Sequence, residues 1–242
     1  MEKGCIAIRW APKGEGNFRR CGTPPKPSLC GVNVHCLPAG PLPTNAYLLA
    51  EPSLGLAVLI DAPLGIWDRV EPVLRKEGCR LGALWLTHGH WDNTQGAAEV
   101  VRRSGVPVSG HRDDQVLYET PEVMRPLTPE EIVMEPVTVD RWLADGELLE
   151  ALGERVEVRH VPGHCPGSLL FYFPGRGVAF GGDALFRESV GRTDLPGGDH
   201  EALMRSIRTR IYTLADETTV FPGHGGPTSV GHEKENNPYV RA

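Results

Sequence analysis

Histidine and aspartate side chains follow one another in the segment 84–96, which reads LWLTHGHWDNTQG. His88, His90 and Asp92 stand two residues apart, directly after the apolar part of this segment. In α/β proteins, functional side chains collect in the loops that leave the carboxyl ends of buried strands. Imidazole and carboxylate groups are ligands that Zn²⁺, Fe²⁺ and Mn²⁺ accept. The spacing therefore indicates a transition-metal site at the end of a strand.

Three further segments repeat this order of apolar strand, glycine-rich turn and metal-capable side chain. They are VRHVPGHCPGS with His164, AFGGDALF with Asp183, and VFPGHGGPT with His224. Glycine lets the backbone turn sharply and approach a compact centre. The ligand-type residues are histidine and aspartate rather than thiolate, which favours a catalytic site over a structural one. Four such segments in one chain form a much stronger signal than a single His-x-His pair.

Together these motifs resemble the metallo-β-lactamase superfamily, whose HxHxDH motif is followed by a His, an Asp and a His. The resemblance covers roughly residues 32–240 and includes PLPTNAYLL, GRTDLPGGDH and GHEKENNP. It is nearest to the short, single-domain hydrolases of glyoxalase II type. The fold that it implies is α/β: a four-layer αβ/βα sandwich of two mixed β-sheets with helices on the outer faces.

The resemblance also implies a ligand set for two metal ions. Three histidines would hold the first metal: His88, His90 and His164. The second metal would be held by Asp92 and His224, and Asp183 would bridge the two. Two of these residues would also be catalytic. Asp92 would orient the attacking hydroxide or take its proton, and Asp183 would hold the metals at a fixed separation.

The chain departs from the family motif at Asn93, where the family has a fourth histidine as a ligand of the second metal. A carboxamide offers only a neutral carbonyl oxygen, which is a poorer donor for zinc than imidazole. We therefore expect one tightly bound Zn²⁺ and a weakened second site.

The implied activity is zinc-dependent hydrolysis of a small thioester or ester, of the acyl-glutathione type, by a metal-activated hydroxide. A second possibility is a mononuclear iron oxygenase that resembles persulfide dioxygenases, with His88, His164 and Asp183 as a two-His, one-carboxylate iron site. A third is a non-catalytic descendant that binds a metal or a partner.

Arg192, in the segment VGRTDLPGG, is the candidate substrate-binding residue. In glyoxalase II relatives a basic residue of this loop contacts glutathione, although a solvated arginine is an equal alternative. We expect no separate C-terminal helical domain of the kind that completes glutathione binding in longer relatives. Cys165 is expected to be a small buried residue rather than a nucleophile. The remaining histidines are expected to be surface or hydrogen-bonded residues: His35, His111, His160, His200 and His232.

Hydrophobic periodicity predicts βα units mixed with hairpins. The segment 111–137 is polar and rich in proline, and we expect one short helix and loops there. A DG turn and an LGE turn should join strands between 138 and 162. The other expected elements are strands at 32–37, 45–51, 56–63, 81–86, 106–110 and 218–222, helices at 66–77, 94–104 and 199–214, a hairpin at 168–183 and a short helix or turn at 231–238.

Composition limits the remaining possibilities. The 242 residues are 40% hydrophobic and carry a formal net charge of −6, which argues against a nucleic-acid binder with a basic face. No apolar run approaches the roughly 18 residues of a membrane span. Residues 1–30 lack the apolar core of a signal peptide, so we expect a cytoplasmic protein. We interpret them as a Gly/Pro-rich extension before a metallo-β-lactamase-like domain at 31–242, which acts on a small-molecule substrate.

Overall fold

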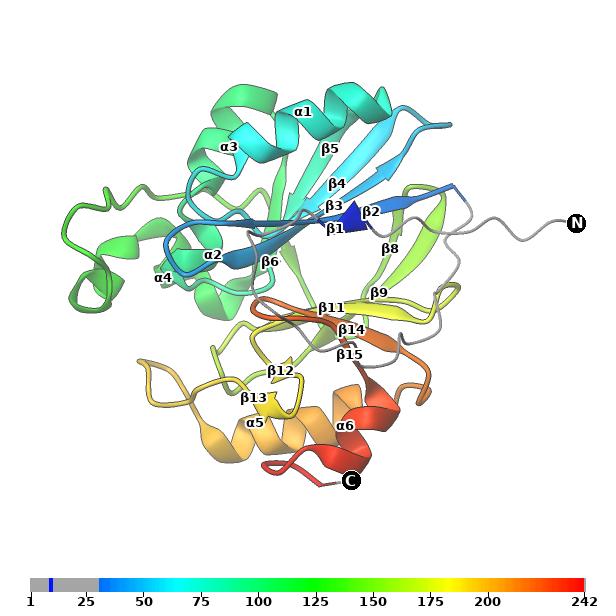
Figure 1. Cartoon of the computed structure of the whole chain (residues 1–242). Helices are drawn as coiled ribbons and strands as arrows, with labels where there is room; N and C mark the ends of the chain where they lie inside the picture. The colour runs from blue at the N-terminus through cyan, green and yellow to red at the C-terminus, as the bar shows by residue number, and fades with distance from the viewer. Residues whose placement is uncertain (1–8, 11–30, 242) are drawn as a thin grey trace, which may run out of the picture.

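Two mixed β-sheets lie face to face, and helices cover the outer side of each sheet (Figure 1). The structure is a computed structural model, and it describes residues 9–10 and 31–241. The four layers confirm the αβ/βα sandwich that the sequence motifs implied. No helix within the described ranges is both long and apolar enough to cross a membrane.

The first sheet has the strand order β1 to β7, so that neighbours in the sheet are also neighbours in the chain. Its β2, β3 and β4 pair antiparallel, whereas β4 to β7 run parallel and require helical crossovers between them. The strands are β1 (Arg9–Trp10), β2 (Asn33–Ala39), β3 (Thr44–Glu51), β4 (Leu56–Ile60), β5 (Arg80–Trp85), β6 (Val108–His111) and β7 (Arg141–Leu143).

The second sheet has the order β15-β14-β11-β10-β9-β8, in which only β11 and β14 pair parallel. The predicted hairpin at 168–183 is present as β10 and β11. A separate two-stranded ribbon pairs β12 with β13. The strands are β8 (Leu148–Ala151), β9 (Glu154–His160), β10 (Leu169–Phe173), β11 (Val178–Gly182), β12 (Leu185–Phe186), β13 (Ser189–Val190), β14 (Thr219–Pro222) and β15 (Thr228–Ser229).

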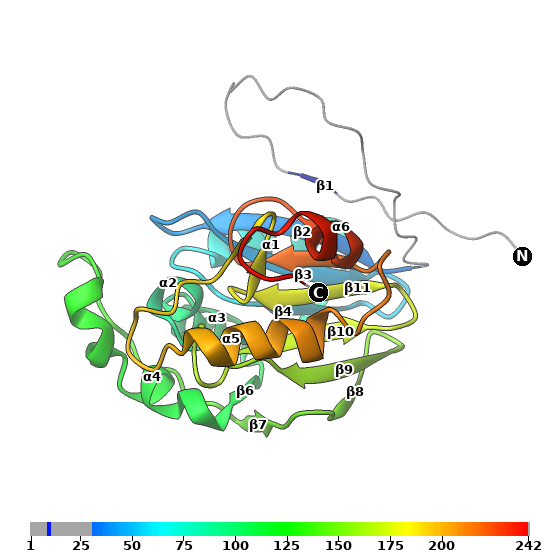
Figure 2. The same ribbon diagram turned by 90° about the horizontal axis from the view of Figure 1, so that it is seen from below.

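Helices α1 (Trp67–Glu77) and α3 (Ala97–Ser104) cover the first sheet, and each ends at a left-handed glycine, Gly78 and Gly105. Helix α5 (His200–Ser206) continues into a π-helical turn at Ile207–Ile211 and lies with α6 (Val230–Asn236) over the second sheet (Figure 2). Asp199 caps α5, because its carboxylate accepts a hydrogen bond from Ala202 N at 2.9 Å. The short α2 (Trp91–Thr94) and α4 (Gln115–Glu119) lie at one end of the sandwich.

Aromatic rings pack between the two sheets and fix the position of one sheet relative to the other. Trp85 of β5 stacks on Phe171 of β10, with ring centroids 5.1 Å apart. Tyr47 of β3 packs against Phe180 and Phe221 of the second sheet, and its hydroxyl donates to Pro222 O at 2.7 Å. Buried aromatic pairs of this kind add about 0.5–1.5 kcal/mol beyond their area burial. They fix the relative position of loops that leave the two sheets at the same end.

The predicted DG turn at Asp145–Gly146 does join two strands, but they belong to different sheets, β7 to the first and β8 to the second. One local prediction needs correction. The predicted helix at 94–104 begins only at Ala97. Gly96 interrupts it, since its N–H donates to Ala62 O at 2.7 Å and a Cβ there would lie 2.2 Å from Pro63 O.

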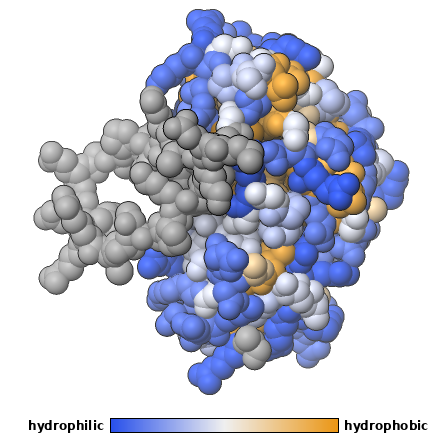
Figure 3. Space-filling model, turned by 90° about the vertical axis from the view of Figure 1, so that its right-hand side faces the viewer, coloured by the Kyte–Doolittle hydropathy of each residue, from blue (hydrophilic) through white to orange (hydrophobic). Residues whose placement is uncertain are grey.

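The segment 111–137 is more helical than expected. Two 3₁₀ helices, η1 (Arg112–Asp114) and η2 (Pro121–Leu127), flank α4. The predicted extension 1–30 lies outside the described residues apart from Arg9–Trp10, which pair with β2, so its separation from the domain stays a prediction. The face of the domain that Figure 3 shows is mostly hydrophilic, with apolar groups in small separate areas.

Candidate metal centre

Four loops meet at one end of the sandwich and bring all six predicted ligands together. The loops follow β5, β9, β11 and β14, so both sheets contribute. The ligand-type side chains form two adjacent groups, and within each group one ligand atom per residue lies within 4.8 Å of the others: His88, His90 and His164, then Asp92, Asp183 and His224. The strand-end positions inferred from sequence are therefore confirmed as neighbours in space.

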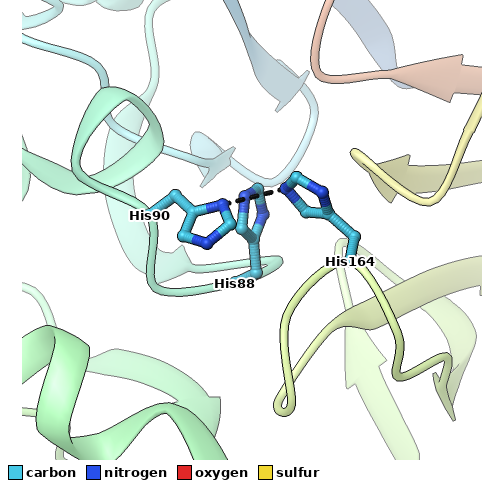
Figure 4. A group of neighbouring side chains, drawn as sticks. All are labelled: His88, His90 and His164. Carbon is cyan, nitrogen blue, oxygen red and sulfur yellow. Dashed lines mark hydrogen bonds between the residues drawn. The ribbon is translucent and has the colours of Figure 1, made fainter. Parts of the chain in front are cut away.

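The first group consists of three buried imidazoles that face one another (Figure 4). His90 Nδ1 and His164 Nε2 lie 2.9 Å apart, and the ring of each packs edge-on against the ring of His88. His88 and His90 come from the loop after β5, whereas His164 comes from a separate loop after β9. Three imidazole nitrogens thus converge on one point from two loops.

Hydrogen bonds behind the rings fix which nitrogen faces that point. The Thr87 hydroxyl donates to Asp61 Oδ2 at 2.7 Å, so it accepts from His88 Nδ1 at 3.1 Å and leaves Nε2 without a proton. His164 Nδ1 donates to Arg192 O at 2.8 Å, which likewise leaves its Nε2 free. Partners that orient histidines in this way accompany almost all metal-binding histidines.

Burial keeps two of these imidazoles neutral. It lowers the pKa of His88 well below the usual value, and neighbouring His164 and His90 lower it further. Burial, followed by the proximity of His164, lowers the pKa of His90 to about 4. A metal requires the neutral imidazole, so these rings need not lose a proton near neutral pH before they bind one.

The second group is charged. His224 Nε2 lies 3.1 Å from Asp92 Oδ2 and 3.4 Å from Asp183 Oδ2. Burial alone would lower the pKa of His224, but hydrogen bonds to Asp183 and Asp92 outweigh it and raise the pKa to about 10. The same bond to His224 holds the pKa of Asp92 below its usual value although burial opposes this. Asp183 Oδ2 is also 3.7 Å from His164 Nε2, so it lies between the two groups.

Asn93 is fully buried beside the first group, with its Nδ2 3.2 Å from His88 Nε2. Among the described residues, three buried polar atoms of this centre find no hydrogen-bond partner: His90 Nε2, Asn93 Oδ1 and Asp183 Oδ1. Each such atom costs about 1–3 kcal/mol when it stays unpaired. Unpaired donors and acceptors among neutral imidazoles and carboxylates fit a site that binds a metal ion with its water.

Asp114 is a buried residue that sequence reasoning missed. Its Oδ2 accepts from Gly89 N at 2.8 Å, and its Oδ1 accepts from Gly167 N at 2.6 Å and from the Cys165 thiol at 3.1 Å. One carboxylate therefore joins the loop of His88 and His90 to the loop of His164. Cys165 is buried as expected, and burial raises the pKa of its thiol well above the usual value.

Two of the other histidines are also closer to each other than the sequence indicated. The rings of His111 and His160 stack with centroids 4.1 Å apart and planes 14° apart, beside Asp113. Parallel rings do not direct their nitrogens at one point. His160 Nε2 donates to Pro166 O at 2.7 Å, so this pair supports the loop of His164 from outside.

A cleft of about 410 Å³ opens over both groups. Trp91, Asp92 and Asp183 line its floor, and Arg192, the predicted substrate residue, lies in its wall. The Arg192 guanidinium donates to both carboxylate oxygens of Asp194 at 2.7 Å. The centre is therefore accessible to a small molecule, beside a cation that is already paired.

The sequence profile of the metallo-beta-lactamase superfamily matches residues 39–224. The chain belongs to this superfamily, and so to a class of metallo-hydrolases. It is 35% identical to the hydroxyacylglutathione hydrolase GloC of Haemophilus influenzae over 214 residues, which cover 87% of this chain and 99% of that protein.

Solved structures show the same fold. The B3 metallo-beta-lactamase BLEG-1 superposes with a TM-score of 0.79 at 33% identity, covering 86% of this chain and 100% of its own. TTHA1623 in a di-iron-bound form superposes with a TM-score of 0.75 at 38% identity, covering 85% of this chain and 99% of its own. ETHE1 from Myxococcus xanthus superposes with a TM-score of 0.67 at 27% identity, covering 81% of this chain and 78% of its own. These structures share the fold, although one is a B3 metallo-beta-lactamase and another was solved in a di-iron-bound form.

Proposed function

We propose that this protein is a zinc-dependent hydrolase of small thioesters or esters, with acyl-glutathione as the preferred class. One observation carries the proposal: two groups of metal-capable side chains, joined through Asp183, form the floor of a cleft of about 410 Å³. The similarity to a hydroxyacylglutathione hydrolase over nearly the full length of both chains supports the substrate class.

When bound, a divalent metal lowers the pKa of a water towards about 7 and polarises a carbonyl group. The residues of the chain supply position and proton transfer. Asp92 Oδ2 faces the cleft between the Thr44 hydroxyl, 3.1 Å away, and His224, so a proton taken from the attacking water has an acceptor there. Asp183 holds the two groups at a fixed separation, as a carboxylate between them must.

The two metal positions should differ in strength. We propose that His88, His90 and His164 hold one metal tightly, because all three are buried and two are oriented from behind. Asn93 contributes a carboxamide where the family motif has a histidine, so Asp92, Asp183 and His224 would hold the second metal more weakly.

An iron oxygenase is the second candidate. His88, His164 and Asp183 offer two imidazoles and a carboxylate, a set typical of mononuclear iron enzymes, and the similarity to ETHE1 is compatible with such a site. The di-iron form of TTHA1623 also shows that a neighbour of this fold accepts iron.

Metal analysis of the purified protein together with two assays separates these candidates. A hydrolase should contain zinc and release glutathione from S-lactoylglutathione or another acyl-glutathione, without oxygen uptake. Oxygen consumption with glutathione persulfide, dependent on iron, would replace the hydrolase by the oxygenase. A protein that binds metal but turns over neither substrate class would favour the non-catalytic alternative. The cytoplasmic location stays a prediction, to be checked by fractionation.

A further inference from the structure

Outside the metal centre, the lining of the cleft is mostly apolar, with Ser189 and Arg192 as its polar side chains. Six of its side chains come from three separate segments: Leu42 between β2 and β3, Met124 and Leu127 of η2, and Phe186, Val190 and Leu195 of the segment after β11. Segments that are distant in the chain thus place apolar groups around one opening.

We propose that this cleft selects thioesters whose acyl group is an apolar chain of several carbons. The inference rests on the proposed hydrolase function and names its substrate more closely. It concerns the acyl half of the substrate, and it assigns Leu42 and Leu127 as residues that determine specificity.

The mouth of the cleft shows apolar surface that a ligand would cover. Leu42 is 51% exposed and Leu127 is 43% exposed, and both line the cleft. Exposed apolar side chains are common singly, but two from separate segments that line one cleft offer apolar surface to a ligand. An acyl chain that enters between them removes this surface from water.

Apolar side chains connect the loop of the metal centre with η2. Trp91 lies beside Asp92 at the floor, and Met124 packs against Trp91 in a buried cluster. In a 3₁₀ helix, side chains three positions apart lie on the same face, which places Met124 and Leu127 side by side, about 6 Å apart along the axis. An acyl chain that lies along Trp91, Met124 and Leu127 therefore meets apolar atoms.

Charge decides which half of an acyl-glutathione lies against this wall. The tripeptide carries carboxylates and an ammonium group, and each loses water and needs a polar partner when it is buried. Leu42, Met124 and Leu127 offer none. Arg192 is the one Lys or Arg among the described lining residues, and Asp194 already holds it. The acyl group therefore occupies the apolar wall, and the tripeptide lies towards Arg192 and solvent.

The experiment is a series of glutathione thioesters of acetate, butyrate, hexanoate and octanoate, with S-lactoylglutathione as the polar comparison. We expect kcat/KM to rise by up to about fourfold per added methylene, and hexanoyl to exceed lactoyl. Leu127→Gln and Leu42→Gln should each flatten the series. Val123→Gln is the matched control, because Val123 belongs to η2 and is 45% exposed but does not line the cleft.

A measurement without turnover accompanies the kinetics. Calorimetric binding of the free carboxylates, from acetate to octanoate, should strengthen with length in the parent and in Val123→Gln, but not in Leu127→Gln. A series without length dependence, with thioesters still hydrolysed, overturns this inference alone. Failure to hydrolyse any thioester, together with length-independent carboxylate binding, overturns both this inference and the proposed function. Equal effects of Leu127→Gln and Val123→Gln overturn the assignment of Leu127.

Discussion

Replacing Thr87 by valine should weaken the first metal site without touching a ligand. The hydroxyl of Thr87 donates to Asp61 at 2.7 Å and accepts from His88 Nδ1 at 3.1 Å. It therefore links a buried carboxylate to the imidazole ring of His88 and fixes the orientation of that ring. Valine removes that link and has nearly the same shape. No water can replace it, because Gly182 packs so closely that a Cβ there would lie 2.4 Å from Thr87 Oγ1.

The size of the effect follows from the groups left without partners. His88 is fully buried, so its Nδ1–H would lose its acceptor at a cost of about 1–3 kcal/mol. Loss of a hydrogen-bond partner behind a metal ligand typically lowers metal affinity about 10- to 100-fold, or about 1.4–2.7 kcal/mol. We expect the Thr87→Val variant to lose Zn²⁺ affinity by a factor within this range and to have a lower melting temperature than the parent.

The assay is competition for Zn²⁺ with a chromophoric chelator, well below the melting temperature of each variant, and circular dichroism verifies the fold. Thr87→Ser is the control, because it keeps the hydroxyl and should bind zinc nearly as tightly as the parent. If valine and serine variants bind Zn²⁺ equally well, the hydroxyl does not orient His88 and this reasoning is refuted. If both lose affinity equally, the packing of the Thr87 methyl group matters instead.

Further substitutions test the other parts of the centre. His164→Ala should abolish tight metal binding and nearly all activity, since an open catalytic site has no spare ligand; retained metal, measured by elemental analysis, would show that the centre is wrongly placed. Asn93→His should raise stoichiometry from nearer one to nearer two zinc equivalents in a zinc titration, and a parent that already binds two tightly would contradict our account. Asp114→Ala should lower both melting temperature and zinc affinity, because Gly89 and Gly167 lose their acceptor, whereas the exposed Asp113→Ala should change neither. Deleting residues 1–30 should leave metal content and folding intact, and an insoluble or metal-free product would make that segment part of the domain.

The sequence predicted that these side chains would be neighbours because each of them lies at the end of a strand. Each ligand-type residue follows a buried strand within a few positions, and strand ends of one fold meet at one edge. His88 and His164 could therefore be assigned to a common site without knowing the sheet order. Loop glycines strengthened the prediction, since they mark close backbone approach.

Residues that support the centre from a distance could not be found in this way. Asp114 lies in a polar segment, and nothing in HRDDQVL distinguishes it from the exposed Asp113 beside it. Its role depends on N–H groups of Gly89 and Gly167, which carry no side-chain signal. The change of sheet at Asp145–Gly146 could not be predicted for a related reason, because turn chemistry predicts a reversal of the chain and not the sheet to which the next strand belongs.

The two groups of side chains in the centre differ in charge. This difference determines how replacing Asn93 by a histidine would affect metal binding. His88 and His90 are neutral, so a divalent metal among the first group would draw its nearest compensating charge from Asp183, whose Oδ2 lies 3.7 Å from His164 Nε2. The second group holds two carboxylates around His224. Asn93 and a histidine ligand are both uncharged, so the exchange alters donor strength and leaves the charge balance as it is. The first site should consequently respond more strongly to the loss of the Asp183 charge than to any change at Asn93.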